Sequence, residues 1–305
     1  MTMPRATGLF HRAIAQSVSD YAITPATAQR IGQYFAEKLG VEPTRQAIET
    51  VPIDRLVQAQ REVEAEIAAN PDPSRWGELA LYRLPFGPVI DGDLLPARPI
   101  DSMAAGAGAN IDVLVGNNAD EFRLWLVPTG MINAVNEEML SSSVAAYGSL
   151  YGLPVAETLA TYRATRQDAT PGDLLAAFMT DLAYRIPAIH IAEAHAKPGT
   201  GATYMYEFAW QSPAFDGRLG ACHVLELPFV FDNLDKEGFE GLLGPNPPQP
   251  VADAMHAAWV AFATSGNPGW PQFDLKRRAT MRFDTTSELL EDPRPAERVL
   301  WESRR

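Results

Sequence analysis

Three short apolar runs, each about the length of one β-strand, most constrain the fold of this chain. The first, "NIDVLVGNN" (110–118), is almost continuously apolar, which is typical of a parallel strand buried on both faces. The other two are "ATYMYEFAW" (202–210) and "ATMRFDTT" (279–286), which we interpret as the last strand. Long stretches with helical spacing separate the runs. Strands alternating with helices predict an α/β fold, with a mostly parallel sheet flanked by helices.

Helical segments are marked by their spacing and by the residues at their ends. "TPATAQRIGQYFAEKLG" has Thr24 as its cap and Pro25 in its first turn, and Gly40 stands just after its end. Residues 131–197 are also mostly helical in pattern. We expect one domain over residues 1–305, in which residues 131–197 form a helical insertion.

The balance of charged residues excludes some classes of partner. The chain has 25 Lys and Arg against 38 Asp and Glu, a net charge of −13, without a basic stripe. Its field would oppose binding to nucleic acid or to an anionic membrane, so we expect neither. No run approaches the ~18 apolar residues of a membrane span. The N-terminus lacks the pattern of a signal peptide, which favours a cytoplasmic location.

Three further features argue against a metal or a nucleotide cofactor. Cys222 is the only cysteine, which excludes an internal disulfide and a Cys-rich metal site. His190 and His195 are five positions apart, so a helix would place them on different faces. "GAGAN" (106–110) has the glycines of a dinucleotide loop, but it follows a helix and precedes a strand, which is the wrong order. We therefore expect no cofactor and no metal.

Two ionisable residues lie where functional groups are found in α/β folds. Glu121 follows the run 110–118, and sites of parallel sheets form at the carboxyl ends of strands. The simpler alternative is an acid favoured by the dipole of the next helix. His223 lies in a loop between Gly220 and the apolar segment "LELPFVF"; its simpler alternative is a hydrogen-bonded structural histidine. We interpret the other histidines as structural residues in helical stretches: His11, His190, His195 and His256.

Five stretches in collinear order carry a resemblance to a known family. They are "GLFHRAIAQS", "FGPVIDGDLLP", "VLVGNNADEF", "CHVLELPFVF" and "WVAFATSGNPGWP". Together they resemble the type-B carboxylesterase family, which includes bacterial para-nitrobenzyl esterases and the cholinesterases, from about Pro4 to the C-terminus. The resemblance implies an α/β-hydrolase fold. It also implies hydrolysis of small-molecule carboxylic esters by a Ser-His-Glu triad through an acyl-enzyme, without a cofactor.

The resemblance assigns roles to four residues. Glu121, in the "DE" pair, matches the acid of the triad, and His223 matches the base. Ser17 and Glu226 match hydrogen-bonding groups that the family places close to that histidine. These roles agree with the chemistry, because an imidazole can take a proton from a serine hydroxyl. A carboxylate on the other ring nitrogen fixes the tautomer and stabilises the imidazolium.

The nucleophile of the family is missing from these 305 residues. No serine has glycine at both −2 and +2, so the G-E-S-A-G elbow is absent. The glycine-rich oxyanion loop and the first strands of the sheet, which the family carries further upstream, are absent as well. Ser17 precedes Val18, where the family usually has glycine, and would lack oxyanion donors. Cys222 is adjacent to His223, so the two side chains should diverge.

The chain therefore resembles roughly the C-terminal three-fifths of an esterase, and we expect it to be inactive alone. A second hypothesis is a non-catalytic protein, possibly a binding protein, that keeps the esterase fold. A third is that the chain does not fold stably alone and is poorly soluble, because a parallel sheet without its central strands exposes unpaired edges. Candidates for the walls of a substrate pocket are Phe122, Trp125 and Phe229. The oligomeric state stays open.

Overall fold

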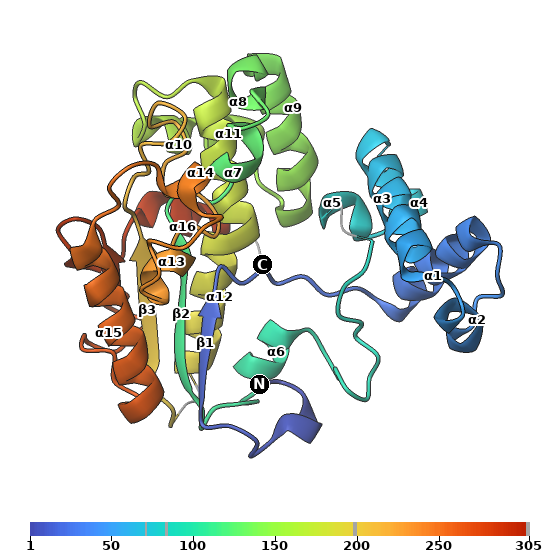
Figure 1. The fold of residues 1–305 in the computed structure, drawn as a ribbon, viewed down its shortest axis with the longest axis horizontal. Coiled ribbons are helices and arrows are strands. Elements are labelled where there is room, and N and C mark those ends of the chain that lie inside the picture. Colours follow the sequence, from blue (N-terminus) through green and yellow to red (C-terminus); the bar gives the residue numbers. More distant parts are fainter. Residues whose placement is uncertain (71, 83–84, 198–199, 303–305) are drawn as a thin grey trace. The chain divides into compact units, whose positions relative to one another are not determined.

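The computed structural model describes residues 1–70, 72–82, 85–197 and 200–302 (Figure 1). The chain falls into two compact units. The larger, which we call the sheet unit, consists of Met1, Gly8–Ser19 and Met103–Arg305. The smaller, which we call the helical unit, consists of Thr2–Thr7 and Asp20–Ser102.

The sheet unit contains one five-stranded sheet in the order β1-β2-β3-β4-β5. The parallel strands are β1 (Arg12–Gln16), β2 (Asp112–Asn118), β3 (Thr203–Phe208) and β4 (Ala279–Phe283). β5 (Glu288–Glu291) pairs antiparallel with β4. Parallel neighbours cannot be joined by a tight hairpin, so helices connect them and cover the faces. The predicted α/β fold and the three predicted strands are confirmed.

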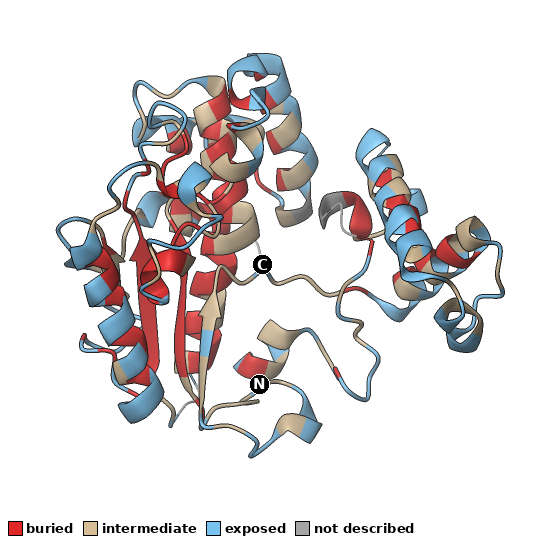
Figure 2. Cartoon of the chain, viewed as in Figure 1, coloured by how far each residue is buried: buried red, intermediate tan, exposed pale blue. Residues whose placement is uncertain are grey.

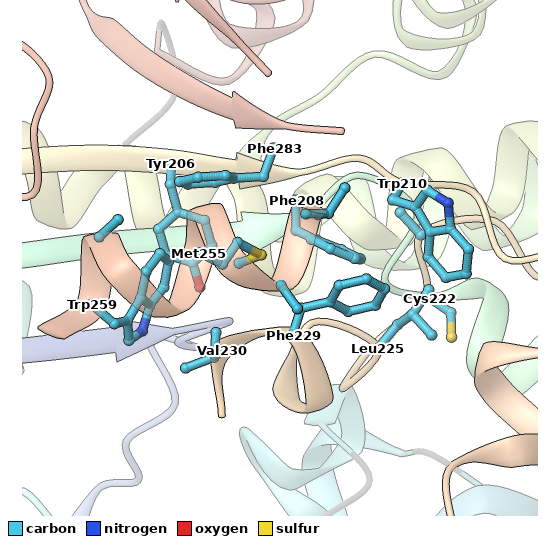
Figure 3. Packing of buried hydrophobic residues seen from close by; sticks show 14 of the residues in the cluster. Tyr206, Phe208, Trp210, Cys222, Leu225, Phe229, Val230, Met255, Trp259 and Phe283 are labelled. Carbon is cyan, nitrogen blue, oxygen red and sulfur yellow. The ribbon is translucent and has the colours of Figure 1, made fainter. Parts of the chain in front are cut away.

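One core lies between the sheet and α15 (Gln249–Ser265). Side chains alternate along a strand, and so Tyr204, Tyr206 and Phe208 of β3 all point into this core. Figure 3 shows Phe208 next to the ring of Phe229, which comes from α13 (Leu227–Val230); the ring centroids are 5.2 Å apart. Aromatic side chains therefore supply much of the apolar area that holds α13 and α15 on this face.

The opposite face of the sheet carries a second core. Val113 and Val115 of β2 and Met205 of β3 point into it; along each strand they alternate with the residues that point into the first core. They pack against α11 (Pro171–Thr180) and α12 (Ile186–Ala196). Figure 2 shows that β2, β3 and much of α12 are buried. Helices on both faces explain why β2 reads as a continuous apolar run.

The helical stretch Pro171–Ala196 joins α11 to α12 through a π-helical turn, η3 (Asp181–Arg185). Within the described chain it is the one helix that is long and apolar enough to cross a membrane, with a mean hydropathy of 1.2. The stretch is not recognisable as a continuous apolar run in the sequence, because Asp181 and Arg185 interrupt the apolar residues. In the structure 67% of the apolar window is buried inside the protein. A buried core helix passes the same test, so the stretch is weak evidence for a membrane span.

The helical unit is built around α1 (Pro25–Leu39) and α3 (Ile53–Ala69), whose apolar faces share one core. The predicted ends of α1 are confirmed. The side chain of Thr24 accepts a hydrogen bond from the backbone N–H of Thr27. Gly40 ends the helix in the left-handed region, with φ +70°, which is readily adopted by glycine.

The remaining elements are short, and they connect or cover the ones above. In the helical unit they are η1 (Pro4–Ala6), α2 (Arg45–Glu49), α4 (Pro73–Trp76), α5 (Leu79–Tyr82) and α6 (Pro99–Ala104, whose last two residues are counted in the sheet unit). In the sheet unit they are α7 (Arg123–Leu126), α8 (Met131–Ala134), α9 (Glu137–Gly148), η2 (Ser149–Tyr151), α10 (Val155–Ala164), α14 (Glu240–Leu243) and α16 (Pro295–Glu302).

Two predictions about local structure were wrong. His11 does not lie in a helix; it directly precedes β1. The segment "RAIAQ" contains two alanines, which favour helix, but pairing with β2 decides its structure. β4 is not the last strand, because β5 follows it. The sequence of β5, "ELLE", carries charges at both ends and is largely exposed, as is usual for an edge strand.

Candidate active site

The candidate site lies at the carboxyl ends of β1 and β2. Ser17 directly follows β1, and Glu121 lies three residues beyond the end of β2. These strands are parallel neighbours, so their carboxyl ends meet at the same edge of the sheet. His223 comes from a loop far along the chain and reaches this edge as well. The structure therefore brings Ser17, Glu121 and His223 together.

Glu121 is the centre of the hydrogen bonds at the site, and its side chain is fully buried. Its Oε1 accepts from Ser17 Oγ at 2.6 Å and from the backbone N–H of Asn118 at 2.7 Å. Its Oε2 lies 2.6 Å from Nδ1 of His223. The carboxylate acts as acceptor in these contacts, so Nδ1 of His223 carries a proton and Nε2 presents its lone pair when the ring is neutral.

The backbone holds Glu121 and His223 at a fixed separation. The N–H of His223 donates to the carbonyl of Glu121 at 3.1 Å, and the N–H of Asp120 donates to the carbonyl of Ala221 at 3.0 Å. Gly220 allows this approach: its φ is +63°, and an added Cβ would lie 2.7 Å from Oδ2 of Asp120. The loops 119–121 and 220–223 are thus paired along their length.

The other edge of the His223 ring is open. The side chain is 24% exposed, and Nε2 has no hydrogen-bond partner among the residues that the structure describes. Two aromatic rings border it: Trp125, with its centroid 5.1 Å away, and Tyr184, with its centroid 4.8 Å away. Trp125 is exposed, and Phe122 packs on it at 5.0 Å. A group that exchanges a proton with Nε2 would therefore lie beside an aromatic surface.

Glu226 is a second buried carboxyl group, and it is joined to Glu121 through Asn118. Its oxygens accept from Asn118 Nδ2 at 2.6 Å and from Gln16 Nε2 at 3.0 Å. Burial raises the pKa of Glu226, and the charge of Glu121 adds to this, while the bonds from Asn118 and Gln16 oppose it. No hydrogen bond joins Glu226 to the ring of His223 in the described part of the chain. Glu226 thus supports the strand ends rather than the imidazole.

Neither Ser17 nor Cys222 is placed as a nucleophile. The hydroxyl of Ser17 donates to Glu121 and not to Nε2 of His223, and Ser17 itself has a left-handed backbone with φ +49°. Cys222 is fully buried, and burial raises the pKa of its thiol to about 12. A thiol with that pKa is protonated at neutral pH and is a poor nucleophile. The site thus holds an oriented imidazole and a buried carboxyl group.

Comparison with known proteins shows the family of this chain. The Carboxylesterase family matches residues 1–300, a range that contains the whole site. The chain belongs to the carboxylesterase family. Among its relatives, the para-nitrobenzyl esterase of Bacillus subtilis is 30% identical, and the match covers 98% of this chain and 58% of that protein. Phenmedipham hydrolase of Pseudarthrobacter oxydans is 28% identical over 88% of this chain and 53% of that protein.

Solved structures of carboxylesterases match this member of the family throughout. A carboxylesterase of Geobacillus stearothermophilus superposes with a TM-score of 0.79 and 28% identity, covering 99% of this chain and 60% of that one. A para-nitrobenzyl esterase structure gives a TM-score of 0.73 over 98% of this chain and 59% of that one. The predicted α/β-hydrolase fold is confirmed. The chain spans between about half and three-fifths of the length of these relatives.

Three residues of the site were missed in the sequence of this carboxylesterase-family chain: Gln16, Asn118 and Tyr184. Gln16 and Asn118 end β1 and β2, and polar residues at the ends of parallel strands are a signal that could have found them. Tyr184 carries no such signal. The prediction that Phe229 lines the wall of a pocket was wrong, because this side chain is fully buried in the first core (Figure 3). Trp125 does border His223, and Phe122 packs on Trp125.

A metal site is not formed by the side chains that the structure describes. Among residues 1–70, 72–82, 85–197 and 200–302, no group of three or more His, Cys, Asp or Glu is arranged to hold an ion. The chemistry that the site offers is proton transfer at Nε2 of His223, with charge stabilisation by Glu121.

Proposed function

We propose that this chain provides the general base and the acid of a Ser-His-Glu triad in a hydrolase of carboxylic esters. The observation that carries the proposal is the pair itself. Glu121 binds Nδ1 of His223 at 2.6 Å, and Nε2 is left open towards an aromatic surface. This is the arrangement that a histidine needs to remove a proton from a hydroxyl group.

The reaction follows from the position of the protons. Nε2 of His223 takes the proton of a serine hydroxyl as the serine oxygen attacks the ester carbonyl. Glu121 stabilises the imidazolium that results. Nε2 then gives the proton to the departing alcohol, which leaves an acyl-enzyme. A water molecule, deprotonated by Nε2, releases the acid and regenerates the serine.

The nucleophile and the oxyanion donors belong to a segment other than these 305 residues. No serine here has glycine at both −2 and +2, and the hydroxyl of Ser17 is bonded to Glu121. The relatives are longer, since this chain covers 58% of the para-nitrobenzyl esterase. We propose small-molecule carboxylic esters as substrates, with p-nitrobenzyl and p-nitrophenyl esters as test compounds.

A chimaera tests the proposal. It joins the part of the Bacillus subtilis esterase that this chain does not match to residues 1–305. We expect the chimaera to hydrolyse p-nitrophenyl acetate, and His223→Ala to lower kcat by roughly 10⁴-fold or more. The matched control is His11→Ala, an exposed histidine just before β1, which should leave kcat unchanged. A folded chimaera whose His223→Ala variant hydrolyses the ester as fast as the parent would refute the assignment.

A second candidate is a non-catalytic protein with an esterase fold. It is favoured by one observation, which is that no nucleophile of the described chain lies on Nε2 of His223. A fluorophosphonate probe separates the two ideas. The chimaera should be labelled and the 305-residue chain should not. Labelling of the 305-residue chain would exclude the non-catalytic candidate, and an unlabelled, folded chimaera would favour it.

A further inference from the structure

The π-helical turn η3 gives the second core helix an unusual geometry next to the site. In a π turn the hydrogen bonds span five residues, so one extra residue is fitted into the helix. Such turns are rare, and many occur at functional sites. Here the turn runs from Asp181 to Arg185 between α11 and α12. It therefore changes the direction of the side chains at one point of an otherwise regular helix.

The turn sends two neighbouring side chains to different places. Arg185 is buried and bonds both oxygens of Asp181, at 3.1 and 3.0 Å, and the carbonyl of Pro293 at 2.7 Å. These charge-assisted bonds fix the backbone of the turn. Tyr184 points instead to His223, and their rings stack with centroids 4.8 Å apart and planes 29° apart. The hydrogen bonds of Arg185 thus also fix the position of Tyr184, the residue before it in the turn.

Trp125 completes a cluster of three rings. Its centroid lies 5.1 Å from that of His223 and 6.2 Å from that of Tyr184, and its plane is within 8° of the plane of Tyr184. Each of the three rings therefore contacts the other two. Trp125 is exposed and comes from the short helix α7, whereas Tyr184 is half-buried and comes from an anchored turn. Tyr184 is the better fixed of the two neighbours.

The ring of Tyr184, rather than its hydroxyl, makes the contact. Its Oη has no hydrogen-bond partner in the described segments. Burial raises the pKa of Tyr184, and the charge of Glu121 adds to this, so the phenol stays neutral. Glu121, from the loop after β2, and Tyr184, from η3, are ionisable groups in contact with the imidazole.

We propose that Tyr184 is a positioning residue for His223. A single hydrogen bond at Nδ1 leaves the imidazole free to swing about its own side-chain bonds. The stacked ring of Tyr184 removes that freedom and keeps Nδ1 on Glu121 and Nε2 towards the open side of the site. The importance of this orientation for catalysis rests on the proposed function. The packing itself does not.

Nitrogen NMR of the 305-residue chain tests the proposal without a nucleophile, so its outcome is independent of the chimaera assay. Two-bond ¹H–¹⁵N spectra of the five histidines report the tautomer of His223, and the exchange of its Nδ1–H with water reports opening of the bond to Glu121. We expect Tyr184→Leu to speed that exchange by about 5- to 10-fold, as loss of an aromatic pair implies. Tyr184→Phe should restore the parent rate.

The matched control is Tyr147→Leu, which truncates a half-buried tyrosine on α9. It should leave the exchange at His223 unchanged. Unchanged exchange in Tyr184→Leu, or an equal effect of Tyr147→Leu, would overturn the proposal. Tyr184→Met replaces Tyr184→Leu where the leucine variant does not fold. Carbon relaxation of the His223 ring in the parent chain is the independent measurement: we expect it to be as rigid as the backbone, and a mobile ring would overturn the proposal.

Discussion

Replacing Glu121 by glutamine should reverse the tautomer of His223. The amide has one acceptor oxygen, and its orientation is decided by the backbone N–H of Asn118, which lies 2.7 Å from Oε1 of Glu121 and needs an acceptor. The oxygen of the amide must therefore take the place of Oε1, and the NH₂ group must face Nδ1 of His223. Nδ1 then has to accept a hydrogen bond, so the ring proton moves to Nε2.

The expected magnitudes follow from this exchange of partners. Every buried polar group keeps a partner, so the variant loses only the added strength of bonds to a charge, and we expect unfolding to be easier by about 1–2 kcal/mol. In the chimaera Nε2 no longer offers a lone pair, and kcat should fall on the order of 10⁴-fold. The Glu121→Gln variant should thus have a small effect on the free energy of unfolding and a large effect on kcat.

Two-bond ¹H–¹⁵N spectra of the folded variant measure the tautomer directly. The control is Glu226→Gln, because Glu226 accepts from Asn118 and Gln16 and, among the residues that the structure describes, is not hydrogen-bonded to the imidazole. It should leave Nδ1 protonated. If Glu121→Gln also leaves the proton on Nδ1, the orientation of the amide deduced from Asn118 is wrong, and so is the role given to Glu121.

Three further predictions concern stability. Phe229→Ala removes a fully buried ring that contacts Phe208, and should cost about 3–5 kcal/mol in urea unfolding; a loss below 1 kcal/mol would contradict the packing in Figure 3. Gly220→Ala places a Cβ 2.7 Å from Asp120 at φ +63° and should lower stability by about 1–3 kcal/mol, whereas the same change at Gly32, which has open space around it, should not. Burial lowers the pKa of His195 from 6.5, so the unfolded chain binds a proton first and Tm should fall as the pH drops below about 6.5. His195→Gln should weaken that fall, and an identical pH dependence in the variant would contradict it.

Much of the sheet could be predicted from local sequence. β2 reads as a strand because helices cover both of its faces, and α1 is marked by Thr24 and Gly40 at its ends. β1 could not be read in this way, since "RAIAQ" is short and its structure depends on pairing with β2, about 100 residues away. Pairing with a strand so far away in the chain produces no periodic pattern of apolar residues within β1 itself.

Some residues of the candidate site could likewise be predicted from the sequence, and others could not. Glu121 and His223 stand after recognisable strands and within motifs, so their positions could be predicted. Tyr184 could not, because a π turn is set by one extra residue in a helix and has no periodicity that a sequence pattern reveals. Phe229 was predicted as a wall because it is aromatic and close to His223 in sequence; its burial depends on α15, which lies further along the chain.

The backbone pairing of the loops 119–121 and 220–223 has a consequence for how the protein can be altered. Glu121 and His223 lie on facing residues of two short segments that hydrogen-bond to each other, Glu121 to His223 and Asp120 to Ala221. Their separation is therefore insulated from the helices α8, α9 and α10, between residues 131 and 164. Those helices can be exchanged, lengthened or redesigned to admit a different molecule while the proton-transfer pair is carried along as one preassembled part.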